Sequence, residues 1–108
     1  SYLESLRRLE AVTGRELIAT VVNGFLAETP RRLARAREAL ERGDAEAFVF
    51  AVHSLKGSSA QLGATRLAAL CGEAEAVGRE GALEGLAPRL RDIEAEAERV
   101  APELRASI

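Results

Sequence analysis

Apolar residues recur at intervals of three and four positions along almost the whole of this chain. That spacing places them on one face of an α-helix, whereas a half-buried strand needs alternation, which no segment shows. The apolar stripes occupy five segments: 3–9, 18–40, 48–62, 67–77 and 83–104. The first is short, and the other four are long enough to pack against one another. The pattern therefore predicts an all-α protein.

Local stop and start signals separate these segments. Gly43 followed by Asp44 is typical of a helix end and a new N-cap. Gly63 is able to adopt the left-handed conformation that ends a helix. Thr65 is then the candidate N-cap of the following helix. These signals predict short connections.

Further glycines and the prolines complete the expected outline. Gly78 and Gly81 are expected to end the fourth segment, and Pro88 lies early enough in the last one to occupy its first turn. Pro30 lies inside the second segment, where it should bend the helix or remove one backbone hydrogen bond. Long amphipathic helices with short connections favour an antiparallel four-helix bundle, with the N-terminal turns as a short capping helix. We expect a single domain over residues 1–108.

The composition excludes several classes of partner. A net charge of −2 provides no general attraction to nucleic acid or to an anionic membrane. Neither a run of eighteen apolar residues nor a charged-then-apolar leader is present, so we expect no membrane span and no signal peptide. The one cysteine, Cys71, fits a reducing compartment and a place in the core. We expect a cytoplasmic monomer, and the chain fits a freestanding protein as well as one module of a longer one.

The only histidine and the only lysine of the chain lie three residues apart, as His53 and Lys56. The other fourteen basic residues are arginines, so this lysine is an exception to the preference of the chain for arginine. A solvent-exposed imidazole is largely neutral at pH 7 and can act as a nucleophile. An ammonium group one helical turn away suits a nucleophile that must hold a transferred anion.

A helical-wheel count at about 100° per residue places His53 on the outer face of its helix. The core face comprises Phe48, Ala51, Val52, Leu55, Ser58, Ser59 and Leu62. Gly57 lies beside His53 in mid-helix, where glycine lowers stability by about 1 kcal/mol relative to alanine. A need for clearance around the imidazole would explain why a glycine occurs at this position. Val49 and Phe50 also lie near His53, either as an exposed docking patch or covered by the N-terminal turns.

Other kinds of site are not supported by the sequence. Glu46 is the only carboxylate on the helix face of His53, so no Ser/His/Asp constellation can be drawn. The run from Lys56 to Ser59 lacks the upstream glycine and the strand of a phosphate-binding loop. The sequence around His53 contains no acidic cluster and no calcium-binding loop. We therefore expect no metal and no cofactor bound by the chain itself.

The segment His53-Ser54-Leu55-Lys56-Gly57-Ser58-Ser59-Ala60-Gln61-Leu62-Gly63-Ala64 resembles the signature of histidine-containing phosphotransfer (HPt) domains. The similarity extends over roughly residues 5–104, including Phe25 to Asp44 upstream and Leu67 to Arg79 downstream. The resemblance implies that His53 accepts a phosphoryl group on the ring nitrogen farther from the backbone. Lys56 would steady the phosphoryl oxygens, and Gly57 would leave room for the active site of a partner.

The resemblance also implies a docking surface. Its candidate residues are Val49, Phe50, Ala60, Gln61 and Arg79. Gln61 lies about 80° from His53 on the wheel, which limits its reach, and Arg79 is equally explained as a cation at a helix end. The wheel places Ser58 and Ser59 on the core side, so we interpret them as packing residues with local hydrogen bonds.

The implied function is that of a phosphorelay carrier in two-component signalling, without turnover of its own. His53 would take the phosphoryl group from a receiver-domain phospho-aspartate and pass it to another receiver aspartate, with magnesium bound by the receiver. The partners would be receivers of response regulators or of a hybrid sensor kinase, in which this domain could itself be a module. Two alternatives stay open: a module of a chemotaxis-class kinase phosphorylated by an ATP-bound catalytic domain, and a receiver-binding helical module that is never phosphorylated.

Overall fold

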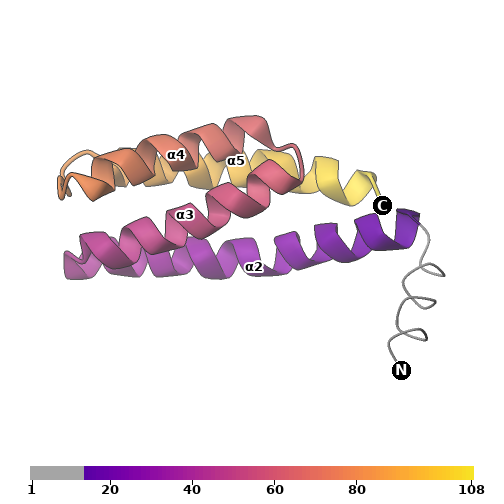
Figure 1. Cartoon of the computed structure of the whole chain (residues 1–108), viewed down its shortest axis with the longest axis horizontal. Helices are drawn as coiled ribbons and strands as arrows, with labels where there is room; N and C mark the ends of the chain where they lie inside the picture. The colour runs from indigo at the N-terminus through magenta and orange to yellow at the C-terminus, as the bar shows by residue number, and fades with distance from the viewer. Residues whose placement is uncertain (1–13) are drawn as a thin grey trace, which may run out of the picture.

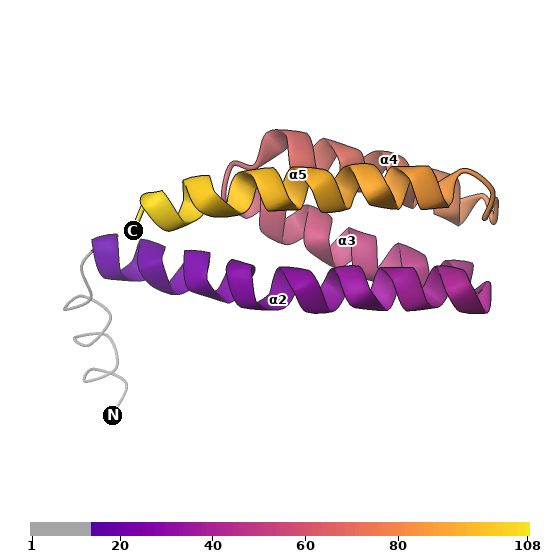
Figure 2. The same cartoon turned by 180° about the vertical axis from the view of Figure 1, so that it is seen from behind.

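The computed structural model describes residues 14–108, which form four α-helices. The helices are α2 (Gly14–Arg42), α3 (Ala45–Gln61), α4 (Thr65–Arg79) and α5 (Leu86–Ala106). Successive helices run in opposite directions and pack side by side, and α5 returns to pack against α2 (Figures 1 and 2). The predicted all-α, antiparallel four-helix bundle is confirmed. The predicted capping helix at 3–9 lies outside the described residues.

The core is built from apolar side chains of all four helices, most of them aliphatic. The fully buried residues include Phe48, Leu55, Leu67, Leu90 and Ile93. Because α2 and α5 are the longest helices, they extend beyond α3 and α4 at the end that holds the start of α2 and the end of α5 (Figures 1 and 2). Each helix turns one apolar stripe inward, as the sequence periodicity predicts.

The first two connections are short and use positive-φ glycines. Gly43 has φ of 70°, and the Asp44 carboxylate then accepts a hydrogen bond from the Ala47 amide at 3.0 Å, as expected of an N-cap. Gly63 has φ of 75° and follows the end of α3. The prediction of Thr65 as the next N-cap is wrong. Ala64 is the N-cap and provides no side-chain hydrogen bond, because α4 starts two residues after Gly63.

The boundaries of the last two helices also correct the sequence reading. Gly78 does not end α4, since it is a buried residue within the helix, and the chain turns at Gly81, with φ of 77°. Leu83 lies in the connection, and α5 begins at Leu86 with Pro88 in its first turn. Pro30 lies within α2, which continues through it.

Candidate functional site

His53 lies on the outer face of α3, and its side chain is 59% exposed. Val52 and Leu55, its near neighbours on the same helix, are buried in the core. Lys56 follows one turn later with its side chain partly exposed. The amphipathic pattern of α3 therefore positions the imidazole at the surface and the helix backbone against the bundle, as predicted.

A carboxylate from the neighbouring helix binds His53. Glu75 of α4 is 6% exposed, and its Oε1 and Oε2 lie 2.6 and 3.2 Å from Nδ1 of His53. Lys56 Nζ donates to Oε2 at 3.0 Å, and an Arg79 guanidinium nitrogen donates to Oε1 at 3.1 Å. One buried carboxylate thus binds three nitrogen-bearing side chains from two helices.

These partners decide the charge of Glu75. Burial raises the pKa of the carboxyl, but hydrogen bonds from Lys56, His53 and Arg79 lower it more, and the result is a pKa of about 2 instead of 4.5. The carboxylate is therefore ionised at neutral pH and can only accept hydrogen bonds. Its short contact with His53 requires a proton on Nδ1.

The proton on Nδ1 determines what the other ring nitrogen can do. A neutral imidazole carries one proton, so Nε2 of His53 then has a free lone pair. Within residues 14–108 no side chain or backbone group forms a hydrogen bond with this nitrogen. In the neutral ring Nε2 therefore carries a lone pair at the surface, and Glu75 lies on the opposite side of the ring as a negative charge.

Sequence reasoning missed Glu75 as the partner of His53 and named only Glu46. Glu46 lies along the same open cleft as His53, but it forms no hydrogen bond with the imidazole. The available signal was an acidic residue on the buried stripe of α4. Glu75 follows Cys71 by four residues and Ala74 by one, and both neighbours are fully buried. A charge in such a position needs partners.

Small residues in α4 allow the two helices to approach. A Cβ on Gly78 would lie 2.8 Å from Cγ2 of Val49, so alanine would clash there. A Cβ on Gly72 would lie 3.5 Å from Cδ of Lys56, whose side chain passes over this glycine towards Glu75. Cys71 lies inside the interface, and burial raises the pKa of its thiol to about 12, which leaves it unreactive.

The predicted docking residues divide into two groups. Val49, Phe50 and Arg79 line one open cleft of about 560 Å³ together with His53. Phe50 is 73% exposed, and Val49 is half-buried against α4. Arg79 is thus more than a helix-end cation, because it also binds Glu75.

The second group lies on α3 on the C-terminal side of His53. Gly57, Ala60 and Gln61 are exposed, and a Cβ on Gly57 would meet no described atom within 4 Å. The prediction of local hydrogen bonds holds for Ser58, whose hydroxyl donates to the Leu55 carbonyl at 3.2 Å. It is wrong for Ser59, whose buried hydroxyl has no hydrogen-bond partner within residues 14–108.

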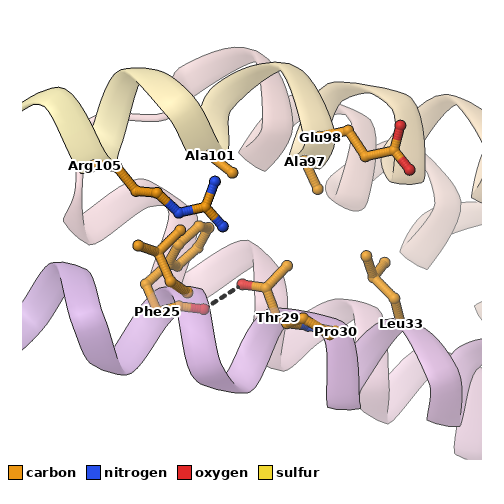
Figure 3. Close-up of a pocket in the computed structure, with 9 residues that line it drawn as sticks. Phe25, Thr29, Pro30, Leu33, Ala97, Glu98, Ala101 and Arg105 are labelled. Atoms are coloured by element: carbon orange, nitrogen blue, oxygen red, sulfur yellow. Dashed lines mark hydrogen bonds between the residues drawn. The ribbon is translucent and has the colours of Figure 1, made fainter.

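Other parts of the described chain show no competing centre. A cavity of about 280 Å³ lies between α2 and α5 and is lined by residues such as Phe25, Leu33 and Ala101 (Figure 3). His53 is not among its lining residues. Within residues 14–108, no three His, Cys, Asp or Glu side chains are grouped to hold a metal ion. None of the four helices is long and apolar enough to cross a membrane.

Comparison with known proteins identifies the family of this chain. The sequence pattern of the Hpt domain matches residues 20–103. The chain belongs to the Hpt domain family. The crystal structure of histidine-containing phosphotransfer protein B (HptB) from Pseudomonas aeruginosa matches with a TM-score of 0.82 and 31% identity, over 94% of this chain and 87% of that one. A search among curated proteins finds no match. Hpt domains are phospho-carriers that interact with receiver domains.

Proposed function

We propose that this Hpt domain accepts a phosphoryl group on Nε2 of His53 from the phospho-aspartate of a receiver and passes it to the aspartate of another receiver. The observation that supports this is the contact between Nδ1 of His53 and the ionised Glu75, at 2.6 Å. It holds the ring proton on the inner nitrogen and leaves the outer one free to attack.

The transfer balances without a further reactant. The lone pair of Nε2 forms a bond to phosphorus, the bond from phosphorus to the aspartyl oxygen breaks, and the receiver carboxylate leaves with the electron pair. The proton on Nδ1 remains in place, so the phosphorylated ring of His53 is cationic, and Glu75 lies against it as the counter-charge. The reverse sequence of bond changes delivers the group to the second receiver.

Two cations can serve the phosphoryl oxygens. Lys56 and Arg79 bind Glu75, and their side chains are 39% and 62% exposed. Phosphoryl transfer depends mainly on positioning and on charge neutralisation, so a nucleophile with adjacent cations is sufficient on this side. Magnesium would be bound by the receiver, and the chain itself would act as a carrier without turnover or cofactor.

The direct test mixes the domain with a radiolabelled, phosphorylated receiver and magnesium. Wild type should acquire acid-labile, base-stable label, and His53→Gln should acquire none. The melting temperature of the variant should change little, because the replaced side chain is mostly exposed and the glutamine amide can donate to Glu75. Label on the variant would contradict the proposal.

The same experiment distinguishes the alternatives. If several receivers fail to label wild type, the donor is changed to an ATP-bound kinase catalytic domain. Labelling by that donor alone would assign the domain to a chemotaxis-class kinase. Failure with both donors, together with measurable receiver binding, would indicate an interaction module that carries no phosphoryl group.

A further inference from the structure

The Lys56 side chain crosses from α3 to α4 over a glycine. Its ammonium donates to Oε2 of Glu75 at 3.0 Å, and its Cδ lies 3.5 Å from the place that a Cβ on Gly72 would occupy. Gly72 precedes Glu75 by three residues, so the two positions are neighbours on the surface of α4. The methylene stem of the lysine therefore lies over Gly72 before the ammonium reaches the carboxylate.

Gly72 differs from Gly78, the other glycine of α4 that adjoins α3. A Cβ on Gly78 would clash with Val49 at 2.8 Å, so the packing of the two helices requires that glycine. At Gly72, by contrast, Cδ of Lys56 is the only described atom of another helix within 4 Å of such a Cβ. A mid-helix glycine lowers stability by about 1 kcal/mol relative to alanine. The space above Gly72 is thus used by the lysine stem.

The same distance limits which side chains could replace Gly72. The methyl group of alanine would be in ordinary van der Waals contact with Lys56, because carbon atoms pack about 3.5–4.0 Å apart. A γ carbon extends about 1.5 Å beyond Cβ, into the layer that the lysine stem occupies. Valine in a helix has γ carbons in both directions that the preceding turn allows, so rotation about χ1 gives it no other position. Valine should therefore displace the Lys56 side chain.

Displacement of Lys56 matters because its ammonium has two places to serve. In the described state Nζ is bonded to Glu75, which contacts Nδ1 on the inner side of the imidazole. A phosphoryl group on Nε2 of His53 would lie on the outer side of the same ring. An ammonium has three N–H donors and can bond to both groups when its stem stays close to α4 and is free to shift. The absence of a side chain at Gly72 provides that freedom.

We propose that Gly72 is a positioning residue for Lys56, which keeps the lysine stem against α4 with its ammonium within reach of Glu75 and of a phosphoryl group on His53. No atom of His53 lies within 4 Å of a Cβ on Gly72, so the effect of Gly72 passes through the lysine. This inference rests on the proposed function, since it takes His53 as the phosphorylated residue. It adds a position of α4 that accepts only glycine or alanine without loss of transfer.

The first test uses the unphosphorylated domain and follows the Glu75 carboxyl by carbon NMR as the pH is lowered. Burial raises the pKa of Glu75, but the hydrogen bond from Lys56 is the largest of the effects that lower it to about 2. Gly72→Val should raise this pKa as far as Lys56→Ala does, and the double variant should show no further rise. Gly72→Ala should keep the wild-type value, as should Ala95→Val, a control at an exposed position of α5.

The second test measures the lifetime of the phosphohistidine after labelling by a phosphorylated receiver. Gly72→Val should shorten the lifetime by about twofold or more, the lower end of the coupling between residues in contact. In the Lys56→Ala background the same change should have no effect, because the residue through which it acts is gone. Gly72→Leu carries a better helix former and should behave as Gly72→Val, which separates loss of the lysine contact from loss of the helix.

Three results would decide against these statements. An unchanged Glu75 pKa and an unchanged lifetime in Gly72→Val would overturn the inference and leave the proposed function intact. Equal effects of Gly72→Val in the wild-type and Lys56→Ala backgrounds would also overturn it, because the change would then act on the packing of α3 and α4. Wild type that takes no label from any receiver would reject the proposed function and the inference with it, whatever the pKa of Glu75.

Discussion

Glu75 accepts a hydrogen bond from His53 across the interface of α3 and α4, with Nδ1 and Oε1 2.6 Å apart. The two residues are 22 positions apart in the sequence, and the carboxylate is almost fully buried while the imidazole is mostly exposed. This arrangement separates two tasks. The contact of Glu75 with Nδ1 determines the tautomer of the neutral ring, and Nε2 is the atom that the proposed transfer uses.

Replacing Glu75 by glutamine should slow phosphoryl transfer about tenfold. The amide can still accept from Nδ1, but a neutral hydrogen bond is weaker than a charged one by about 1.4 kcal/mol, which corresponds to one factor of ten in rate. Single-turnover transfer from a phosphorylated receiver measures the change. Glu46→Gln is the matched control, because Glu46 shares the cleft without bonding to His53. Equal rates in the two variants would contradict the role of Glu75.

The tautomer itself can be observed. Nitrogen NMR of neutral His53 in wild type should show the proton on Nδ1, since the ionised Glu75 can only accept. In Glu75→Ala the two tautomers should exchange, with a shift towards the ordinary mixture for an exposed imidazole. A wild-type spectrum with the proton on Nε2 would exclude the proposed direction of attack.

Acid should destabilise the fold partly through Glu75. Its pKa is about 2 in the folded chain against 4.5 as the ordinary value, so its contribution to stability is complete above pH 4.5 and is lost as the pH falls towards 2. Urea unfolding of wild type should therefore shift to lower midpoints in this window, and Glu75→Gln should show a weaker pH dependence. The pKa of Glu96 is also lowered, chiefly by hydrogen bonds from Arg99. Protonation of Glu96 should therefore account for part of the acid destabilisation that remains in Glu75→Gln.

The control for this acid effect is Glu73→Gln, at an exposed position of the same helix. It should retain the pH dependence of wild type. The interpretation fails if the urea midpoints of Glu75→Gln and Glu73→Gln depend on pH in the same way.

Removing Lys56 should affect the phosphorylated state more than the fold. Lys56→Ala should slow transfer or shorten the lifetime of the phosphohistidine, since one of the two cations beside His53 is lost. Lys56→Arg keeps the charge and should retain most of the rate. Circular dichroism should show an intact bundle for both variants. Unaltered kinetics and lifetime in Lys56→Ala would show that the lysine is an ordinary surface residue.

Two glycines beside the site should respond in opposite ways to alanine. Gly57→Ala should stabilise the fold by up to about 1 kcal/mol, because the added methyl group meets no described atom and alanine favours the helix. Gly78→Ala should destabilise it, because its Cβ would lie 2.8 Å from Val49 and force α3 and α4 apart. Denaturant midpoints measure both. The same sign for the two variants would contradict this account of the interface.

Much of the bundle follows from local rules. The apolar spacing places His53 outside and Phe48 and Leu55 inside α3, and the structure has them there. The N-cap at Asp44 is also confirmed, because a cap depends only on residues within one turn. Thr65 shows the limit of such rules, since the residue type suits a cap but the backbone enters the helix one residue earlier. The chemical roles of His53, Lys56 and Gly57 stay predictions for the kinetic tests.

The sequence alone determined which residues share a face of each helix, because about 100° of rotation per residue is a property of the backbone and needs no partner. It therefore placed His53, Lys56 and Gly57 together at the surface. Only the tertiary structure decided which side chain of another helix meets the imidazole. That depends on the rotation and offset of α4 against α3, which approach so closely that a Cβ on Gly78 would lie 2.8 Å from Cγ2 of Val49. This packing brings Glu75 and Arg79 to the site.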